Sequence, residues 1–138
     1  MRPVVYDAGA LIALDRGKKN SAFAALHSQI TTKGLNPAVP AAVIGQVYRD
    51  GARQARLSHF LRKGSTDDAL ADVHVLDEAV AKDAGVLCGK AGTADVVDAS
   101  VVLLAARLGA IIVTSDPGDI AKLIEAMVPR PNVEIYTV

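Results

Sequence analysis

The stretch "AIIVTSDPGDI", Ala110 to Ile120, decides how this chain is expected to fold. A short apolar run rich in β-branched residues is typical of a strand buried on both faces of a parallel sheet. The run leads directly into Thr114, Ser115 and Asp116, and Asp119 follows soon after. A buried strand that ends on carboxylates needs something nearby to balance their charge.

The rest of the chain alternates between short apolar strands and helical patterns. Two strands are expected at the sheet centre, Pro3–Tyr6 and Ala110–Thr114, two nearer its edges, Val73–Leu76 and Val133–Val138, and a weaker one at Leu35–Val39. Helices are expected at Ala10–Leu14, Ser21–Lys33, Ala41–Asp50, Ala52–Lys63, Asp77–Leu87, Ala94–Leu108 and Pro117–Met127. This alternation predicts a three-layer α/β/α fold with a largely parallel central sheet. The length of 138 residues fits a single domain, 1–138.

The composition excludes several classes of protein. Fifteen basic residues are balanced by fifteen acidic ones, so overall charge gives no argument for binding nucleic acid. One cysteine, Cys88, cannot form an intramolecular disulfide and suggests a reducing compartment. The apolar segment Val101–Val113 is interrupted by Arg107 and Gly109 and is too short to span a bilayer. A soluble, cytoplasmic protein that does not use a membrane is therefore expected.

Several aspartates are predicted to meet at one edge of the sheet. Asp7 follows the first strand and Asp116 follows the strand at Ala110–Thr114, so both lie at the edge where ligands bind in parallel sheets. Asp95 and Asp98 share one face at the start of an apolar helix. Each acid alone has a structural explanation, as a helix cap, a helix-dipole partner or a turn residue.

Taken together, these acids favour a metal site. Converging carboxylates repel one another unless a cation lies between them. No pair of histidines or cysteines has metal-ligand spacing, and an all-oxygen site suits Mg²⁺ or Mn²⁺. Such an ion can activate water for attack on phosphorus, so the pattern indicates phosphodiester hydrolysis.

Two long motifs resemble those of PIN domains, in particular the VapC-type toxins. They are "VVYDAGALIALDRG" at Val4–Gly17 and "DASVVLLAARLGAIIVTSD" at Asp98–Asp116. The resemblance implies a PIN-like fold and a Mg²⁺- or Mn²⁺-dependent endoribonuclease, the toxin of a type II toxin–antitoxin pair, with a cognate antitoxin and often a homodimeric state. It also implies roles for particular residues: Asp7, Asp98 and Asp116 as catalytic residues and metal ligands, Asp119 as a further metal ligand, and Asp95 at the border of the site.

One position departs from the family pattern. Gln46 stands where a glutamate is common, and an amide cannot supply the missing negative charge. Metal binding is then weaker, or Asp50 or Asp95 supplies the charge, or the domain is a catalytically weak or inactive module that binds RNA or protein. Thr114 and Ser115 are candidates for holding a metal-bound water or a carboxylate, or are ordinary strand-end residues.

Contacts with RNA and with a partner are predicted elsewhere. If one helix continued past Gly51, Arg49, Arg53 and Arg56 would share a face able to follow RNA phosphates; the alternative is a solvated helix face. The acids could receive an arginine from the antitoxin, and the helices "SAFAALHSQI" and "AAVIGQVY" could receive a partner helix. Phosphoryl transfer through an aspartyl intermediate is a further alternative, but no second acid stands beside Asp7 and no lysine ends the later strand.

Overall fold

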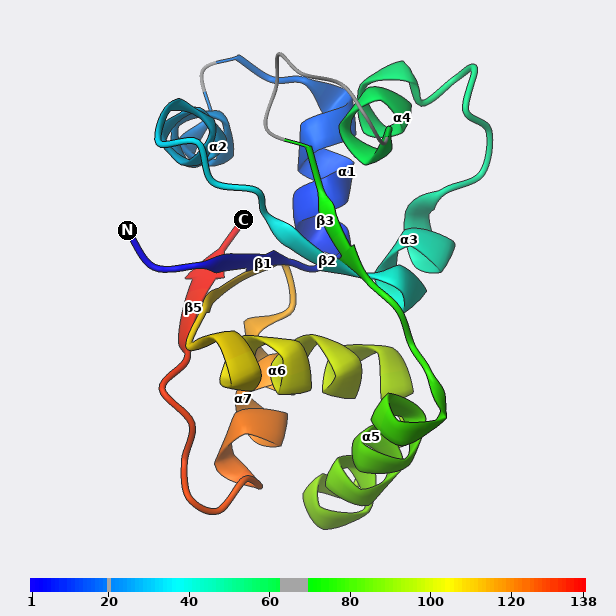
Figure 1. The fold of residues 1–138 in the computed structure, drawn as a ribbon, viewed down its shortest axis with the longest axis vertical. Coiled ribbons are helices and arrows are strands. Elements are labelled where there is room, and N and C mark those ends of the chain that lie inside the picture. The colour runs from blue at the N-terminus through cyan, green and yellow to red at the C-terminus, as the bar shows by residue number, and fades with distance from the viewer. Residues whose placement is uncertain (20, 63–69) are drawn as a thin grey trace.

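The computed structural model describes residues 1–19, 21–62 and 70–138 (Figure 1). Within these residues, five strands form one parallel sheet in the order β3-β2-β1-β4-β5. The strands are β1 (Val4–Tyr6), β2 (Ala38–Pro40), β3 (Asp72–His74), β4 (Ile111–Thr114) and β5 (Glu134–Thr137). The helices are α1 (Ala8–Arg16), α2 (Ala22–Thr32), α3 (Ala41–Val47), α4 (Ala55–Leu61), α5 (Glu78–Ala91), α6 (Val96–Leu108) and α7 (Pro117–Glu125).

The sheet confirms the expected α/β class, and it places the two strands expected nearer the edges at its two edges. β1 and β4 are neighbours at the centre, with Val5 opposite Ile112 in the register. All three residues of β1 are buried, as are the last three of β4, because helices cover both faces of the sheet. β3 and β5 lie at the two edges and are partly exposed, as their mixed polar and apolar sequences predicted.

The helices form two layers, one on each side of the sheet (Figure 1). α1, α2 and α4 pack together on one side, and α5, α6 and α7 pack together on the other. α6 runs against the central strands, and its core-facing residues Ala99, Val101 and Val102 are fully buried. This explains why α6 is apolar almost all round. None of the described helices is long and apolar enough to cross a membrane.

Three helices begin at aspartates that the sequence singled out. Asp7 is the N-cap of α1, Asp95 the N-cap of α6 and Asp116 the N-cap of α7. Because β1 and β4 are parallel neighbours, α1 and α7 start at the same edge of the sheet. The topology therefore brings the starts of α1 and α7 to the predicted ligand-binding edge.

Candidate metal centre

Three carboxylates converge where α6 and α7 begin. One oxygen from each of Asp98, Asp116 and Asp119 lies within 4.8 Å of the others. We call these three residues the acid cluster. Asp98 projects from the first turn of α6 and is buried, whereas Asp116 and Asp119, before and within the first turn of α7, are exposed. Among the described residues, no ion pair involves any of the three. The cluster thus joins one buried acid to two that solvent reaches.

Asp7 lies beside the cluster, and protein groups hold its carboxylate. Its Oδ1 accepts a hydrogen bond from the backbone N–H of Ala8 at 2.8 Å. Its Oδ2 accepts one from the hydroxyl of Thr114 at 2.7 Å. The sequence predicted Asp7 as a metal ligand. Among the described residues, however, Asp7 is not one of the three carboxylates whose oxygens lie within 4.8 Å of one another. Its charge nevertheless acts on the cluster, since it contributes to the raised pKa values of Asp98 and Asp116.

Thr114 connects the two central strand ends. Its side chain is fully buried, donates to Asp7 and accepts a hydrogen bond from the backbone N–H of Asp116 at 3.0 Å. Of the two alternatives for Thr114, the structure thus shows a hydroxyl that holds a carboxylate. Ser115 contacts a different element. It lies against Gly9 in the first turn of α1, and a Cβ added to Gly9 would lie 2.6 Å from the Ser115 Cβ.

The acids perturb one another as mutual repulsion predicts. Burial, followed by the charges of Asp95, Asp7 and Asp116, raises the pKa of Asp98 to about 7. A hydrogen bond with the Asp119 side chain is the largest cause that raises the pKa of Asp116. Without a cation, the site therefore retains a proton well above the usual range for a carboxyl group.

Asp95 stands next to the buried acid. Its Oδ1 accepts a hydrogen bond from the backbone N–H of Asp98 at 2.9 Å and so caps α6. Its charge is the second largest cause of the raised Asp98 pKa. Asp95 thus lies next to Asp98 at the start of α6, and its place at the border of a metal site stays a prediction.

We expect metal-free protein to be less stable at pH 8 than at pH 5. A carboxyl with a raised pKa binds its proton more tightly when folded, so its stabilising contribution is lost as pH rises through about 7. For Asp98 alone the loss is about 2 kcal/mol, or several degrees in Tm. Thermal unfolding in EDTA at both pH values measures it.

The Asp98→Asn variant provides the comparison for this measurement. It should lose most of that pH dependence. This result distinguishes Asp98 from His27, because burial lowers the pKa of His27 and that shift makes the folded protein more stable as pH rises. Equal pH dependence of the variant and the unmodified protein would contradict the assignment.

Gln46 and Asp50 do not join the acids through any described interaction. Gln46 is exposed near the end of α3. Asp50 accepts a hydrogen bond from the N–H of Ala52 and lies 3.7 Å from the Nε of Arg53. Asp50 is therefore engaged in its own loop, and Asp95 is the better candidate for the charge that Gln46 lacks.

The three arginines predicted for RNA do not lie on one continuous helix. α3 ends at Val47 and α4 begins at Ala55, so Arg49 and Arg53 are in the connecting loop. Gln54 stabilises this break, because its Oε1 accepts hydrogen bonds from the N–H groups of Arg49 and Asp50. The prediction of a single helical face is wrong, and Arg56 instead lines a cavity beside α1.

No sequence pattern indicated that cavity or His27, which is one of its lining residues. His27 is distant from the acids in sequence, and its Nδ1 lies 2.7 Å from the hydroxyl of Tyr6, the residue before Asp7. A histidine on the apolar face of an otherwise ordinary helix gives no local signal for such a contact.

The comparisons with known proteins concern the fold. Neither protein-family models nor curated proteins match the sequence. A chain in the structure of FitAB bound to an IR36 DNA fragment is 11% identical, with 97% of this chain and 94% of that chain covered and a TM-score of 0.63. A chain of VapBC2 from Rickettsia felis, bound to a DNA fragment from its promoter, is 12% identical, with coverage of 96% and 98% and a TM-score of 0.62. The chain therefore has the PIN-type fold of the VapC-like proteins that its sequence motifs resemble.

Proposed function

We propose that this protein is a Mg²⁺- or Mn²⁺-dependent endoribonuclease, the toxin of a type II toxin–antitoxin pair. One observation carries the proposal: the carboxylates of Asp98, Asp116 and Asp119 meet without a cationic partner among the described residues, at the carboxyl edge of a PIN-type sheet. The resemblance of both sequence motifs to VapC-type toxins supports RNA as the substrate and the cytoplasm as the place of action.

The donor set fits a hard divalent cation. All ligands are carboxylate oxygens, the kind that Mg²⁺ and Mn²⁺ prefer. The repulsion that raises the pKa values of Asp98 and Asp116 is a second argument, because a cation would relieve it. Asp98, Asp116 and Asp119 would hold the ion, and Asp7 would keep a fixed negative charge beside it.

The protein's own part in hydrolysis is to hold these groups in place. When bound, the ion would polarise a phosphate oxygen and lower the pKa of a water molecule. Thr114 fixes Asp7 through its hydroxyl and fixes the backbone of Asp116 by accepting its N–H. Asp95 orients the first turn of α6, which carries Asp98. Arg49 and Arg53, both exposed, are the proposed phosphate contacts outside the cluster.

Gln46 supports a second candidate, a module of the same fold that binds RNA or protein but cleaves weakly or not at all. An amide at this position removes a negative charge from the set that the resemblance implies. Asp95, whose charge reaches Asp98, favours the catalytic proposal because it supplies a nearby negative charge.

An antitoxin partner and a homodimeric state complete the proposal. Both neighbouring structures are described as bound to DNA fragments, FitAB to IR36 and VapBC2 to a fragment from its promoter. For this chain, the exposed carboxylates of Asp116 and Asp119 could receive an arginine of the antitoxin, which would exclude the metal ion.

Cleavage of RNA by the purified protein tests the nuclease proposal. Total RNA should be cut in Mg²⁺ or Mn²⁺ and remain intact in EDTA. Because water is the proposed nucleophile, the products should carry no 2′,3′-cyclic phosphate, which distinguishes this activity from contaminating nucleases that use the 2′-hydroxyl. Cleavage that persists in EDTA would contradict the proposed dependence on a metal ion, and absence of cleavage with either ion would favour the interaction module.

A further inference from the structure

The segment between α3 and α4 presents an aromatic side chain to solvent. The chain has three tyrosines and two phenylalanines, all of them within the described residues. Tyr48, which follows the last residue of α3, is 42% exposed, and the other four are buried or half-buried. Among the described residues, Tyr48 is therefore the aromatic side chain that a ligand outside the core can reach most readily.

Hydrogen bonds from one glutamine hold the segment after Tyr48 in a fixed shape. The Oε1 of Gln54 accepts hydrogen bonds from the backbone N–H of Arg49 at 2.7 Å and of Asp50 at 3.0 Å. Its Nε2 donates to the carbonyl oxygen of Val47 at 2.8 Å. A side chain carried on a preorganised segment loses less conformational entropy when it binds a ligand.

Gly51 makes room for the ring of Tyr48. A Cβ added to Gly51 would lie 2.5 Å from the Tyr48 hydroxyl oxygen and 3.5 Å from the ring carbon that carries this oxygen. The hydroxyl of Ser58 donates to the carbonyl oxygen of Gly51 at 3.2 Å and so fixes this part of the backbone. The tip of the ring thus lies against the backbone, while the residue as a whole remains exposed.

Arg49 places a fixed positive charge beside this ring. Its Nη1 donates to the carbonyl oxygens of Gly45 at 3.1 Å and of Tyr48 at 2.8 Å. Both partners are neutral, and no ion pair within the described residues involves Arg49. A guanidinium group has five N–H donors, so its Nε and Nη2 are left to bind a phosphate group.

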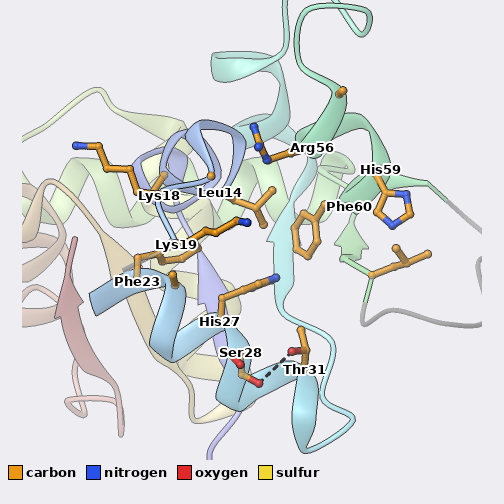
Figure 2. Close-up of a pocket in the computed structure, with 15 residues that line it drawn as sticks. Leu14, Lys18, Lys19, Phe23, His27, Ser28, Thr31, Arg56, His59 and Phe60 are labelled. Carbon is orange, nitrogen blue, oxygen red and sulfur yellow. Dashed lines mark hydrogen bonds between the residues drawn. The ribbon is translucent and has the colours of Figure 1, made fainter. Parts of the chain in front are cut away.

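The segment leads from the carboxyl edge of the sheet to a group of cations. α3 begins directly after β2 at that edge and packs against α1 and α6 (Figure 1). Tyr48 follows about 10 Å of helix. Arg56, at the start of α4, lines a cavity of about 640 Å³. Figure 2 shows Arg56 next to Leu14, with Lys19 extending across the opening.

We propose that Tyr48 is a specificity-determining residue that stacks on an unpaired base of RNA, while Arg49 binds the adjoining phosphate. The inference rests on the proposed function in taking RNA as the substrate. An exposed ring can stack only on a base whose face is free, and the bases of a duplex already stack on one another. Arg56 and Lys19 would bind phosphates farther along the same strand. The protein would thus prefer single-stranded RNA to duplex RNA.

Binding of RNA in EDTA measures this contact without cleavage. The probes are a fluorescein-labelled single-stranded RNA of about twelve nucleotides, without self-complementarity, and the same strand annealed to its complement. Tyr48→Ala should weaken binding of the single strand about tenfold and leave binding of the duplex unchanged. Tyr48→Phe keeps the ring and should bind the single strand as the unmodified protein does. Fluorescence anisotropy measures the affinities.

The salt dependence of binding distinguishes the ring from the cation. Arg49→Met should reduce the slope of log Kd against log salt by about 0.7, the value for one phosphate contact on a single strand. Tyr48→Ala should lower the affinity without changing that slope. Lys33→Met is the matched control for Arg49→Met, because Lys33 is exposed at the C-cap of α2, and neither affinity nor slope should change. Thermal unfolding verifies that the variants are folded.

The outcome can be separated from that of the nuclease proposal. A protein that binds single-stranded RNA through Tyr48 but does not cut it would support this inference and contradict the nuclease proposal. RNA cleavage in Mn²⁺ whose KM is unchanged by Tyr48→Ala would do the reverse. Equal losses for single strand and duplex, a Tyr48→Phe protein as weak as Tyr48→Ala, or no measurable binding of RNA would each overturn the role of Tyr48.

Discussion

Asp98→Asn is expected to reduce metal-dependent RNA cleavage by about 10²–10³-fold while making the metal-free protein more stable. The amide keeps the shape of the side chain but removes the buried charge of the acid cluster. Repulsion from Asp95, Asp7 and Asp116 disappears with it, so Tm at pH 8 should rise. Initial cleavage rates in Mn²⁺ and thermal unfolding in EDTA measure the two effects.

The opposite signs of these effects distinguish a metal ligand from a residue that only supports the fold. Asp83→Asn is the control, because Asp83 is an exposed acid of α5 outside the cluster, and neither activity nor stability should change appreciably. An Asp98→Asn protein that cleaves RNA at the unmodified rate would exclude Asp98 as a ligand. A variant that loses activity because it is unfolded at pH 8 would contradict the stability argument.

Gly9→Ala is expected to lower activity by about two orders of magnitude by displacing the start of α7. A Cβ on Gly9 would lie 2.6 Å from the Cβ and 2.8 Å from the backbone N of Ser115, so rotation of the serine hydroxyl cannot relieve the overlap. The backbone between β4 and α7 must move away from α1, and Asp116 moves with it. Displacements of about 1 Å at a reacting centre cost rates of this size.

Stability should respond less than activity to this change. Overpacking costs about 1–3 kcal/mol, and alanine recovers up to about 1 kcal/mol of helix propensity. Gly85→Ala provides the matched control, since nothing lies within 4 Å of the added Cβ in the middle of α5. That variant should be slightly more stable and fully active. A crystal structure of Gly9→Ala protein with an undisturbed Ser115 would contradict the mechanism.

The sequence was informative about the acids because their positions depend on regular local features. The apolar runs Pro3–Tyr6 and Ala110–Thr114 predict buried parallel strands, and the residues that follow parallel strands lie at one edge of the sheet. Asp98 could be singled out because an acid in a helix that is apolar all round needs an explanation. The first argument depends on the pairing of neighbouring parallel strands, and the second depends on the apolar pattern of one helix. Both can be recognised in the sequence.

The remaining features depend on contacts between distant segments. The loop between α3 and α4 looks helical in composition, but Gln54 bonds to backbone groups of Arg49, Asp50 and Val47 and keeps it open. The position of Asp7 behind the cluster depends on the Thr114 hydroxyl, far away in sequence. The cavity likewise depends on the contact between His27 of α2 and Tyr6 of β1, which belong to different layers of the fold. No local pattern encodes such pairings.

The N-caps described for α1, α6 and α7 have an energetic consequence for the empty state. Each helix start carries a partial positive charge of roughly half an elementary unit, and all three starts carry an acid of this region: Asp7, Asp95 and Asp116. The backbone thereby offsets part of the negative charge before any ion arrives. Under the proposed function, the chain can fold first and bind a metal ion afterwards, so chelation should abolish the proposed RNA cleavage without unfolding the protein.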